Sequence, residues 1–408
     1  MPKPDPFGDL IAPFSRRGVD LGLERLQNAL AELGHPERQF AAVQVAGTNG
    51  KGSISTMLER IGTAAGLRTG LYTSPHLLSW CERIRLPDGL IGVEPLREHL
   101  AGMQALALRH QLTPFELITA AAFVAFAEAG VELAVLEVGL GGRLDATTTH
   151  PNRQVLALAA IGMDHTEHLG STLAAIATEK AGVMHTGAIA VSGPQAAEAE
   201  AVLRQVAQAR QCSLRWVEPL AAASAGGPPL GLRGELQRHN AAVAVGAAQA
   251  LAEQGWAINQ AAILQGLAQA RWPGRLEHRR FQGQPLMVDG AHTPPAAEAL
   301  RKELDDPGPR RWLIGSQRHK DAPDLLLRLL RAGDAVRVVA LPEHPSWSAS
   351  ALREALQALS PEAVQIDAAS GDLAADLAWL VQSQALPVVA GSLYLVAEVL
   401  PLLDPAPD

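Results

Sequence analysis

Apolar and polar positions along this chain form a repeating pattern of short apolar runs and longer segments with helical spacing. The runs at 40–45, 132–139 and 154–162 are almost continuously apolar, which is typical of strands covered on both faces. Residues 114–130 carry apolar side chains at helical spacing and stop at Gly130. The same reading predicts further strands at 67–73 and 188–193 and further helices at 51–66, 172–182, 195–211 and 239–255. Such alternation predicts a parallel sheet wrapped by helices.

The pattern is interrupted and then restarts, which predicts a second domain. Residues 220–236 are small and rich in Gly and Pro, and Pro273-Gly274 breaks the pattern again. Beyond this point four strands and four helices alternate once more. We therefore predict two α/β domains, at 1–273 and 274–408.

Length and composition agree with this division and exclude several classes of protein. A chain of 408 residues is too long for one ordinary core, and 48% hydrophobic with 19% charged residues is typical of a soluble protein. The net charge of -8 argues against a general nucleic-acid binder. Cys81 and Cys212 lie far apart, which fits a reducing cytoplasm better than a disulfide framework or a zinc site.

The start of the chain and its apolar runs give no sign of a membrane segment. No run approaches the roughly 18 residues that a membrane helix needs. Residues 1–10 contain three prolines and no apolar core of a signal peptide, so we expect a loose N-terminal arm.

Residues 47–53, GTNGKGS, lie between the first predicted strand and its helix and have the features of a phosphate-binding loop. The spacing departs from G-x-x-x-x-G-K-[ST], because Val45 stands where the first Gly would be and Gly52 separates Lys51 from Ser53. Glycines let the backbone turn tightly and expose N–H groups, and the helix adds its positive N-terminal end. We interpret the segment as a variant P-loop, and not as a turn with a solvated lysine. The first domain is then P-loop ATPase-like, and the smaller second domain is Rossmann-like.

Polar residues also follow two other apolar strands of the first domain. Glu137 lies at the carboxyl end of one strand, where a carboxylate can meet a metal held by phosphates. An unpaired charge inside so apolar a run is costly, which argues against simple solvation. Asp164 and His165 follow the next strand, and Lys180 comes fifteen residues later on a helix, where a lysine is usually solvated.

The second domain has polar residues in equivalent places. Asp289 and His292 end a strand and open a helix, and Lys320 and Asp321 follow the next strand. Such positions face the ligand edge of an α/β sheet. We therefore expect a cleft between the domains, with ATP held by one and covered by the other.

Taken together, these motifs resemble the ATP-dependent Mur-ligase superfamily and, within it, the folylpolyglutamate synthase/dihydrofolate synthase family. The family's motifs occur here in the family's order as GTNGKGS, YTSPHLLSWCERIR, EVGLGGRLDATT, DHTEHLG, EKAG, NAA, PGR and DGAHTP. Residues 19–26, VDLGLERL, are similar to a segment of the bacterial bifunctional members. Thr148 and Thr293 stand where the family has asparagine, so an amide is lost and a hydroxyl is kept.

The resemblance implies a role for each matching residue. For the triphosphate it implies Thr48, Asn49, Gly50, Lys51, Gly52 and Ser53, and for further nucleotide contacts Asn240, Arg275 and Asp289. For two Mg²⁺ ions it implies the ligands Ser74, Glu137 and His165, together with a carbamylated Lys180. For the pterin-side pocket it implies Gly18, Val19, Asp20, Leu21, Thr113, Pro114, Phe115, Glu116, Leu144, Asp145 and Ala146, with Asp145 the foremost polar contact. His292 is placed on the glutamate side, where it helps to bind or orient the amine.

The activity that the resemblance implies is ATP-dependent amide ligation. ATP phosphorylates the carboxylate of a pterin acid, and the amine of L-glutamate attacks the acyl phosphate. Dihydropteroate and reduced folates are the expected acids, and the expected enzyme is a cytoplasmic monomer without nucleic-acid or membrane partners. Three alternatives stay open: a monofunctional folylpolyglutamate synthase, a ligase of the same superfamily that acts on a cell-wall nucleotide precursor, and a nucleotide-gated binding module with little or no turnover.

Overall fold

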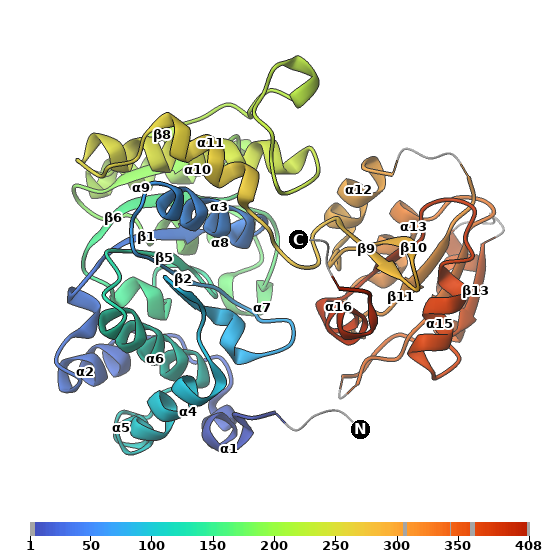
Figure 1. Ribbon diagram of the computed structural model, residues 1–408, viewed down its shortest axis with the longest axis horizontal. Helices are drawn as coiled ribbons and strands as arrows, with labels where there is room; N and C mark the ends of the chain where they lie inside the picture. The colour runs from blue at the N-terminus through green and yellow to red at the C-terminus, as the bar shows by residue number, and fades with distance from the viewer. Residues whose placement is uncertain (1–4, 305–307, 343, 360–363, 406–408) are drawn as a thin grey trace. The chain divides into compact units, whose positions relative to one another are not determined.

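The computed structural model describes residues 5–304, 308–342, 344–359 and 364–405 and divides into two compact units (Figure 1). Unit 1 runs as far as Leu232 and includes Gln237–Arg271, whereas unit 2 comprises Arg233–Leu236 and the chain from Trp272 onward. The chain passes between units at Arg271 and Trp272, two residues before the position predicted from the sequence. No helix among the described residues combines the length and the apolar character needed to span a membrane.

Unit 1 is built on an eight-stranded sheet with the strand order β4-β3-β2-β5-β1-β6-β7-β8. The strands are β1 (Ala41–Ala46), β2 (Thr69–Tyr72), β3 (Ile84–Leu86), β4 (Gly89–Leu90), β5 (Leu133–Glu137), β6 (Arg153–Leu158), β7 (Ile189–Ser192) and β8 (Ser213–Trp216). Six of them run parallel, but β3 is antiparallel to β2 and β4 is antiparallel to β3. The expectation of a purely parallel sheet is therefore wrong at this edge, because the two residues between β3 and β4 allow only a hairpin.

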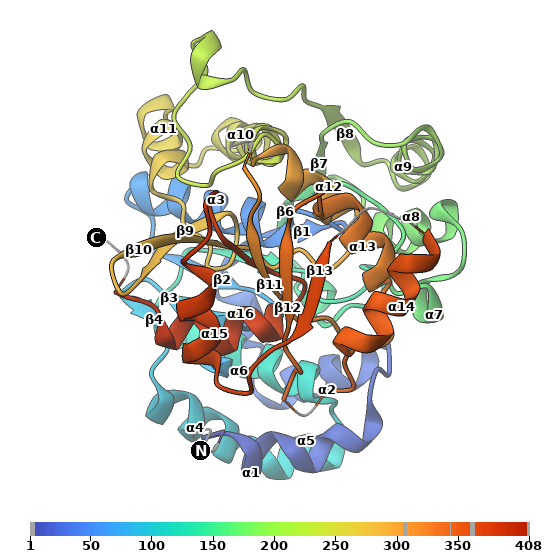
Figure 2. The ribbon, with the colours of Figure 1, turned by 90° about the vertical axis from the view of Figure 1, so that its right-hand side faces the viewer.

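Helices cover both faces of the unit 1 sheet, as Figure 2 shows. They are α1 (Gly8–Ile11), α2 (Glu24–Glu32), α3 (Lys51–Ala64), α4 (Val93–Gly102), α5 (Gln104–His110), α6 (Pro114–Glu128), α7 (Thr166–Leu169), α8 (Leu173–Ala181), α9 (Ala197–Arg210), α10 (Leu236–Glu253) and α11 (Gln260–Gln269). Side chains alternate between faces along a strand. Ala42 and Leu136 pack on one face with α6, and Leu156 and Leu158 pack on that face with α8 and α9. The other face is covered by α3, α10 and α11.

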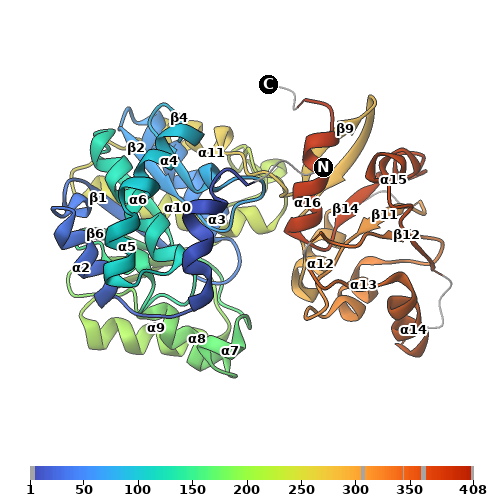
Figure 3. The same ribbon diagram turned by 90° about the horizontal axis from the view of Figure 1, so that it is seen from below.

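Unit 2 contains a six-stranded sheet with the order β13-β12-β11-β14-β10-β9. Its strands are β9 (Glu277–Phe281), β10 (Gln284–Val288), β11 (Arg311–Ile314), β12 (Ala335–Val338), β13 (Gln365–Ala368) and β14 (Val388–Ala390). All pairs are parallel except β9 with β10. The helices α12 (Pro294–Lys302), α13 (Ala322–Leu329) and α14 (Ala349–Leu359) cover one face, and α15 (Leu373–Leu380) and α16 (Leu393–Val399) cover the other (Figure 3). Two α/β sheets thus confirm the predicted fold class.

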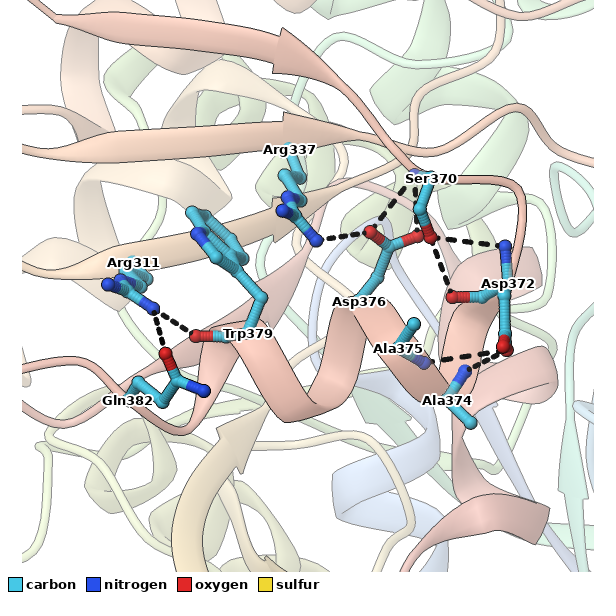
Figure 4. Close-up of polar contacts among 9 residues, drawn as sticks. All are labelled: Arg311, Arg337, Ser370, Asp372, Ala374, Ala375, Asp376, Trp379 and Gln382. Atoms are coloured by element: carbon cyan, nitrogen blue, oxygen red, sulfur yellow. Dashed lines mark hydrogen bonds and ion pairs between the residues drawn. The ribbon is translucent and has the colours of Figure 1, made fainter.

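A buried acid attaches α15 to the sheet of unit 2 (Figure 4). The Asp376 carboxylate is 1% exposed, accepts two hydrogen bonds from the backbone N–H of Ser370, and pairs with Arg337 Nη1 at 2.8 Å. Trp379, one turn later, lies against the guanidinium groups of Arg337 and Arg311 at 4.4 and 5.0 Å from its ring centre. These contacts hold the helix that sequence periodicity did not single out.

The expectation of a loose N-terminal arm at residues 1–10 is wrong for residues 5–10. Phe7 is fully buried, and Ile11 and Phe14 join it in the core beneath α6. Apolar side chains at spacings of four and three residues form one face of α1 and the turn after it. The prolines that suggested disorder lie mostly before this face, and residues 1–4 are outside the described chain.

Candidate functional site

Four neighbouring parallel strands of unit 1 end at the same edge of the sheet, and each is followed by a loop with predicted site residues. In the order β2, β5, β1 and β6, these loops or strand ends carry Ser74, Glu137, Gly47–Gly50 and His165. Adjacent strands lie about 4.8 Å apart, so β5 and β6 flank the loop after β1 at a spacing of about 10 Å. The topology therefore gathers these residues around the glycine-rich loop, as expected for the ligand edge of such a sheet.

The glycine-rich loop presents the N-terminus of α3 without a side-chain cap. Gly50 has φ +100° and is the N-cap residue, and no side chain in the part of the chain that the structure describes caps this helix. The Thr48 hydroxyl both donates to the Gly162 carbonyl and accepts from the Gly162 N–H, each at 3.1 Å. The loop is thus fixed to the segment after β6, while the first N–H groups of α3 stay available to an anion.

Asn240 lies directly against this loop, although it is almost two hundred residues away in the sequence. A Cβ atom at Gly50 would be only 2.2 Å from Asn240 Oδ1, so only glycine leaves room for this amide. Asn240 is held in place because its Nδ2 donates to Gln237 Oε1 at 3.0 Å on the same helix. The structure therefore brings Asn240 to the glycine-rich loop.

Lys180 is buried beneath the loop, with 4% of its surface exposed. Its Nζ donates to the Gly47 carbonyl at 2.8 Å. Burial lowers the pKa of Lys180 to about 7, and the positive charge of Lys51 adds to this effect, against weaker attraction from Asp164 and Asp145. A solvated lysine is thus excluded at this position, and an amine that is partly neutral near pH 7 takes its place.

Ser74 and Glu137 meet at the ends of β2 and β5. The backbone N–H of Ser74 donates to Glu137 Oε2 at 3.3 Å, and Glu137 is 4% exposed. Within the described residues no group of three or more His, Cys, Asp and Glu side chains is arranged to hold a metal. A serine hydroxyl and a carboxylate are nevertheless the hard oxygen donors that suit Mg²⁺ when phosphate oxygens supply the remaining ligands.

His165 lies on the other side of the glycine-rich loop. It has φ +48°, precedes α7, and leaves 47% of its side chain exposed. Its ring nitrogens lie 3.6 Å from Asp164 and 3.7 Å from Glu167. The left-handed backbone is uncommon for a residue with a Cβ and fixes the direction in which the imidazole leaves the loop.

The three segments predicted for the pterin side lie next to one another in unit 1. Arg25 joins two of them, because its guanidinium contacts Asp20 Oδ2 at 3.1 Å and Glu116 at 3.2 Å. Phe115 of the second segment lies against Gly139, where an added Cβ would be 2.5 Å from its ring, and the Gly139 N–H donates to Asp145 of the third segment at 3.0 Å. The sequence analysis missed Arg25, although it lies within the matching segment 19–26 and is the first basic residue there.

Within these segments, the carboxylates of Glu116 and Asp145 accept hydrogen bonds from backbone N–H groups of the protein. The Glu116 carboxylate accepts from the backbone N–H of Thr113 at 2.7 Å and completes a capping box at the start of α6. Asp145 is 2% exposed and accepts hydrogen bonds from the backbone of Gly139, Leu140 and Thr147. Burial raises the pKa of Asp145, whereas these hydrogen bonds act to lower it. Its carboxylate therefore shapes the loop after β5.

A buried polar network supports the same loop from below, and sequence reasoning missed it. Gln44, in the middle of the otherwise apolar β1, donates to the hydroxyls of Thr147 and Thr148 at 2.8 Å. Its Oε1 accepts from Arg153 Nη1 at 2.6 Å. The Thr148 hydroxyl in turn donates to Gly142 O at 2.7 Å. The threonine that departs from the family pattern therefore both accepts and donates a hydrogen bond here. A glutamine within an apolar strand was the available signal.

The predicted residues of unit 2 cluster at the end of β10. The buried Asp289 accepts from the backbone N–H of Leu276 and of Ala291, both at 2.8 Å. Burial raises the pKa of Asp289, while the nearby Arg275 opposes the rise. The ring of His292 contacts the Gly290 carbonyl at 2.9 Å. Asp321, also noted in the sequence, caps α13.

Comparison with known proteins covers both units of the chain. Residues 275–402 match the family model described as dihydrofolate synthetase, C-terminal domain. A probable dihydrofolate synthetase of Schizosaccharomyces pombe is 31% identical over 93% of this chain and 98% of its own length. A folylpolyglutamate synthase of Lacticaseibacillus casei is 33% identical over 92% of each chain.

A solved structure extends the likeness to three dimensions. The bifunctional folylpolyglutamate synthase/dihydrofolate synthase of Yersinia pestis, complexed with AMPPNP and a manganese ion, superimposes with a TM-score of 0.82. The two sequences are 29% identical, and the match covers 98% of this chain and 99% of that one. With its glycine-rich loop, buried lysine and strand-end carboxylate in place, the chain belongs to the folylpolyglutamate synthase/dihydrofolate synthase family.

Proposed function

We propose that this protein is an ATP-dependent ligase that joins L-glutamate to a pterin acid, with dihydropteroate and reduced folates as the acids. The observation that carries the proposal is the convergence of four strand ends of unit 1 on one uncapped helix N-terminus, with Lys51 and the buried Lys180 beside it. Family membership supports both the reaction class and the substrates.

The chemistry begins with transfer of the γ-phosphoryl group of ATP to the carboxylate of the pterin acid. The N–H groups at the start of α3 and the ammonium of Lys51 hold the phosphates and neutralise the charge that develops on them. Asn240, placed against Gly50, limits where the nucleotide can lie. The resulting acyl phosphate is then open to attack by the α-amine of glutamate, and phosphate leaves as the amide forms.

We propose Ser74, Glu137 and His165 as the protein ligands of Mg²⁺. When bound, the ion supplies charge neutralisation to the phosphates. The resemblance implies a second ion and a carbamylated Lys180. An amine with a pKa near 7 supports carbamylation, because only the neutral form reacts with carbon dioxide. Carbamylation would turn the buried cation into an anion next to the loop.

For the pterin side, we propose that Arg25 is the residue that positions Gly18–Leu21 against Thr113–Glu116. Asp145 and the network from Gln44 to Arg153 fix the loop that includes Leu144–Ala146. For unit 2, we propose nucleotide contacts from Arg275 and Asp289 and a glutamate-side role for His292, as the resemblance implies. We propose further that the enzyme acts as a cytoplasmic monomer.

The test is to measure phosphate release with ATP, Mg²⁺ and L-glutamate while the acid is varied. We expect turnover that depends on both dihydropteroate, or a reduced folate, and glutamate. Lys51→Ala should abolish turnover, whereas Lys302→Ala, at an exposed lysine of unit 2, should retain it. Equal turnover without an acid, or a preference for UDP-linked peptides, would contradict the proposed substrates. Substantial activity of Lys51→Ala would contradict the role of the loop.

A further inference from the structure

A polar cavity lies in unit 1 at the far end of α3 from the glycine-rich loop. It has a volume of about 330 Å³ and lies between the last turns of α3 and the β3–β4 hairpin. The lining residues are Glu59, Arg60, Thr63, Arg85, Leu86, Pro87, Asp88, Gly89 and Leu90. This volume is at the lower end of the range for small-molecule sites. None of these residues has a part in the proposed ligase site.

Two arginines in this cavity share a single carboxylate oxygen. Glu59 Oε2 lies 3.3 Å from Arg60 Nε and 3.6 Å from Arg85 Nη1. Glu59 is only 3% exposed, and its Oε2 makes no hydrogen bond within the described chain. The lining holds two arginines and two acids, but of the two acids only Glu59 contacts the guanidinium groups. The second acid, Asp88, is exposed in the hairpin turn.

Burial makes it costly to hold the charge of Arg85 close to that of Arg60. Burial lowers the pKa of Arg85, Glu59 opposes this effect, and the nearby charge of Arg60 lowers the pKa further. A bound anion would relieve the repulsion between the two guanidinium groups and use their N–H donors, which match the oxygens of a carboxylate or phosphate.

We propose that this cavity binds a compact oxyanion, with Arg60 and Arg85 as its ligands and Glu59 as the residue that orients both. The shared chemistry is a small phosphate or dicarboxylate, because two forked donors fit paired oxygens and the space admits few further atoms. Residues 51 and 59 are eight positions apart on α3, or about 12 Å along the helix. The proposed site is therefore separate from the phosphate-binding loop, although the same helix links the two.

The experiment is calorimetric titration of the whole protein with inorganic phosphate, in the presence of saturating AMPPNP and Mg²⁺ so that the positions of all three nucleotide phosphates are filled. We expect one binding event in the wild type, weakened at least tenfold in Arg85→Gln and in Arg60→Gln. Lys51→Ala, titrated without nucleotide, should retain the event, since that lysine belongs to the other site. Sodium chloride at matched ionic strength should give no such event.

Malonate in place of phosphate separates the two sources of the anion. Tighter binding of malonate assigns a dicarboxylate, and tighter binding of phosphate assigns a phosphate compound; both support the site. No binding of either anion by the AMPPNP-saturated wild type would overturn the proposal, as would unchanged binding by Arg60→Gln. Arg60 is the more exposed of the two arginines, so replacing it should disturb folding less. If Arg85→Gln fails to fold, Arg60→Gln therefore still tests the proposal. Circular dichroism and ADP affinity verify that each variant is folded.

Discussion

Replacing Lys180 with methionine should make this enzyme more stable while it abolishes activity. The lysine is buried against the Gly47 carbonyl, and its pKa is lowered from the ordinary value of 10.5 to about 7. Each unit of difference corresponds to about 1.36 kcal/mol, so the shift sets an upper limit of about 5 kcal/mol on the destabilisation at low pH. Loss of the hydrogen bond from Lys180 to the Gly47 carbonyl destabilises the variant by about 1.5 kcal/mol. We expect a net gain of about 3 kcal/mol at pH 7 in Lys180→Met.

The pH dependence follows from the direction of this shift. Because the unfolded chain binds the proton more tightly, the wild type gains stability as pH rises from about 7 to 10.5. The advantage of Lys180→Met should therefore be largest at or below pH 7, and by about pH 10.5 the wild type should be the more stable protein, by about the 1.5 kcal/mol of its hydrogen bond. Methionine is similar in length to lysine and leaves no large cavity, so packing changes contribute little.

The assay is urea unfolding of both proteins between pH 6.5 and 9.5, in buffer depleted of carbon dioxide so that the lysine stays an amine. Lys302→Met, at an exposed lysine, is the matched control and should show no pH-dependent gain. A variant no more stable than the wild type at pH 7 would refute the argument from burial. A stability difference that stays constant across this pH range would refute it as well. Phosphate release measures the expected loss of activity.

Three further predictions concern other parts of the molecule. Arg25→Ala should raise the KM for the pterin acid at least tenfold with little change in the KM for ATP, because Arg25 joins Asp20 to Glu116 on that side only; steady-state kinetics measures both. Gly50→Ala should raise the KM for ATP at least tenfold, since φ +100° is strained for alanine and its Cβ would overlap the nearby amide; a normal nucleotide affinity would contradict the loop geometry. Asp376→Ala should destabilise unit 2 by about 3 kcal/mol, because the buried end of its ion pair is removed; thermal unfolding measures this, and a loss below about 1 kcal/mol would show that the pair is dispensable.

Local patterns predicted much of the molecule from the sequence. The continuous apolar runs predicted β1, β5 and β6, because a strand that is buried on both faces has apolar side chains at nearly every position. The motif around Lys51 predicted a phosphate-binding loop, and motif order led to the family, which the comparisons confirm. The antiparallel edge and the buried start of the chain escaped prediction, since short or irregular segments carry little periodicity.

The residues that support the site were decided only by the tertiary structure. Sequence distance says nothing about which loops share a sheet edge, so the contact between Gly50 and Asn240 emerges only from the path of α10. In the same way, Gln44 and Arg153 find each other because β1 and β6 are neighbours in the sheet. The sequence by itself determined which local structures form and what chemistry they carry. The fold decided which buried charges meet, because burial and electrostatic coupling depend on distances in space and not along the chain.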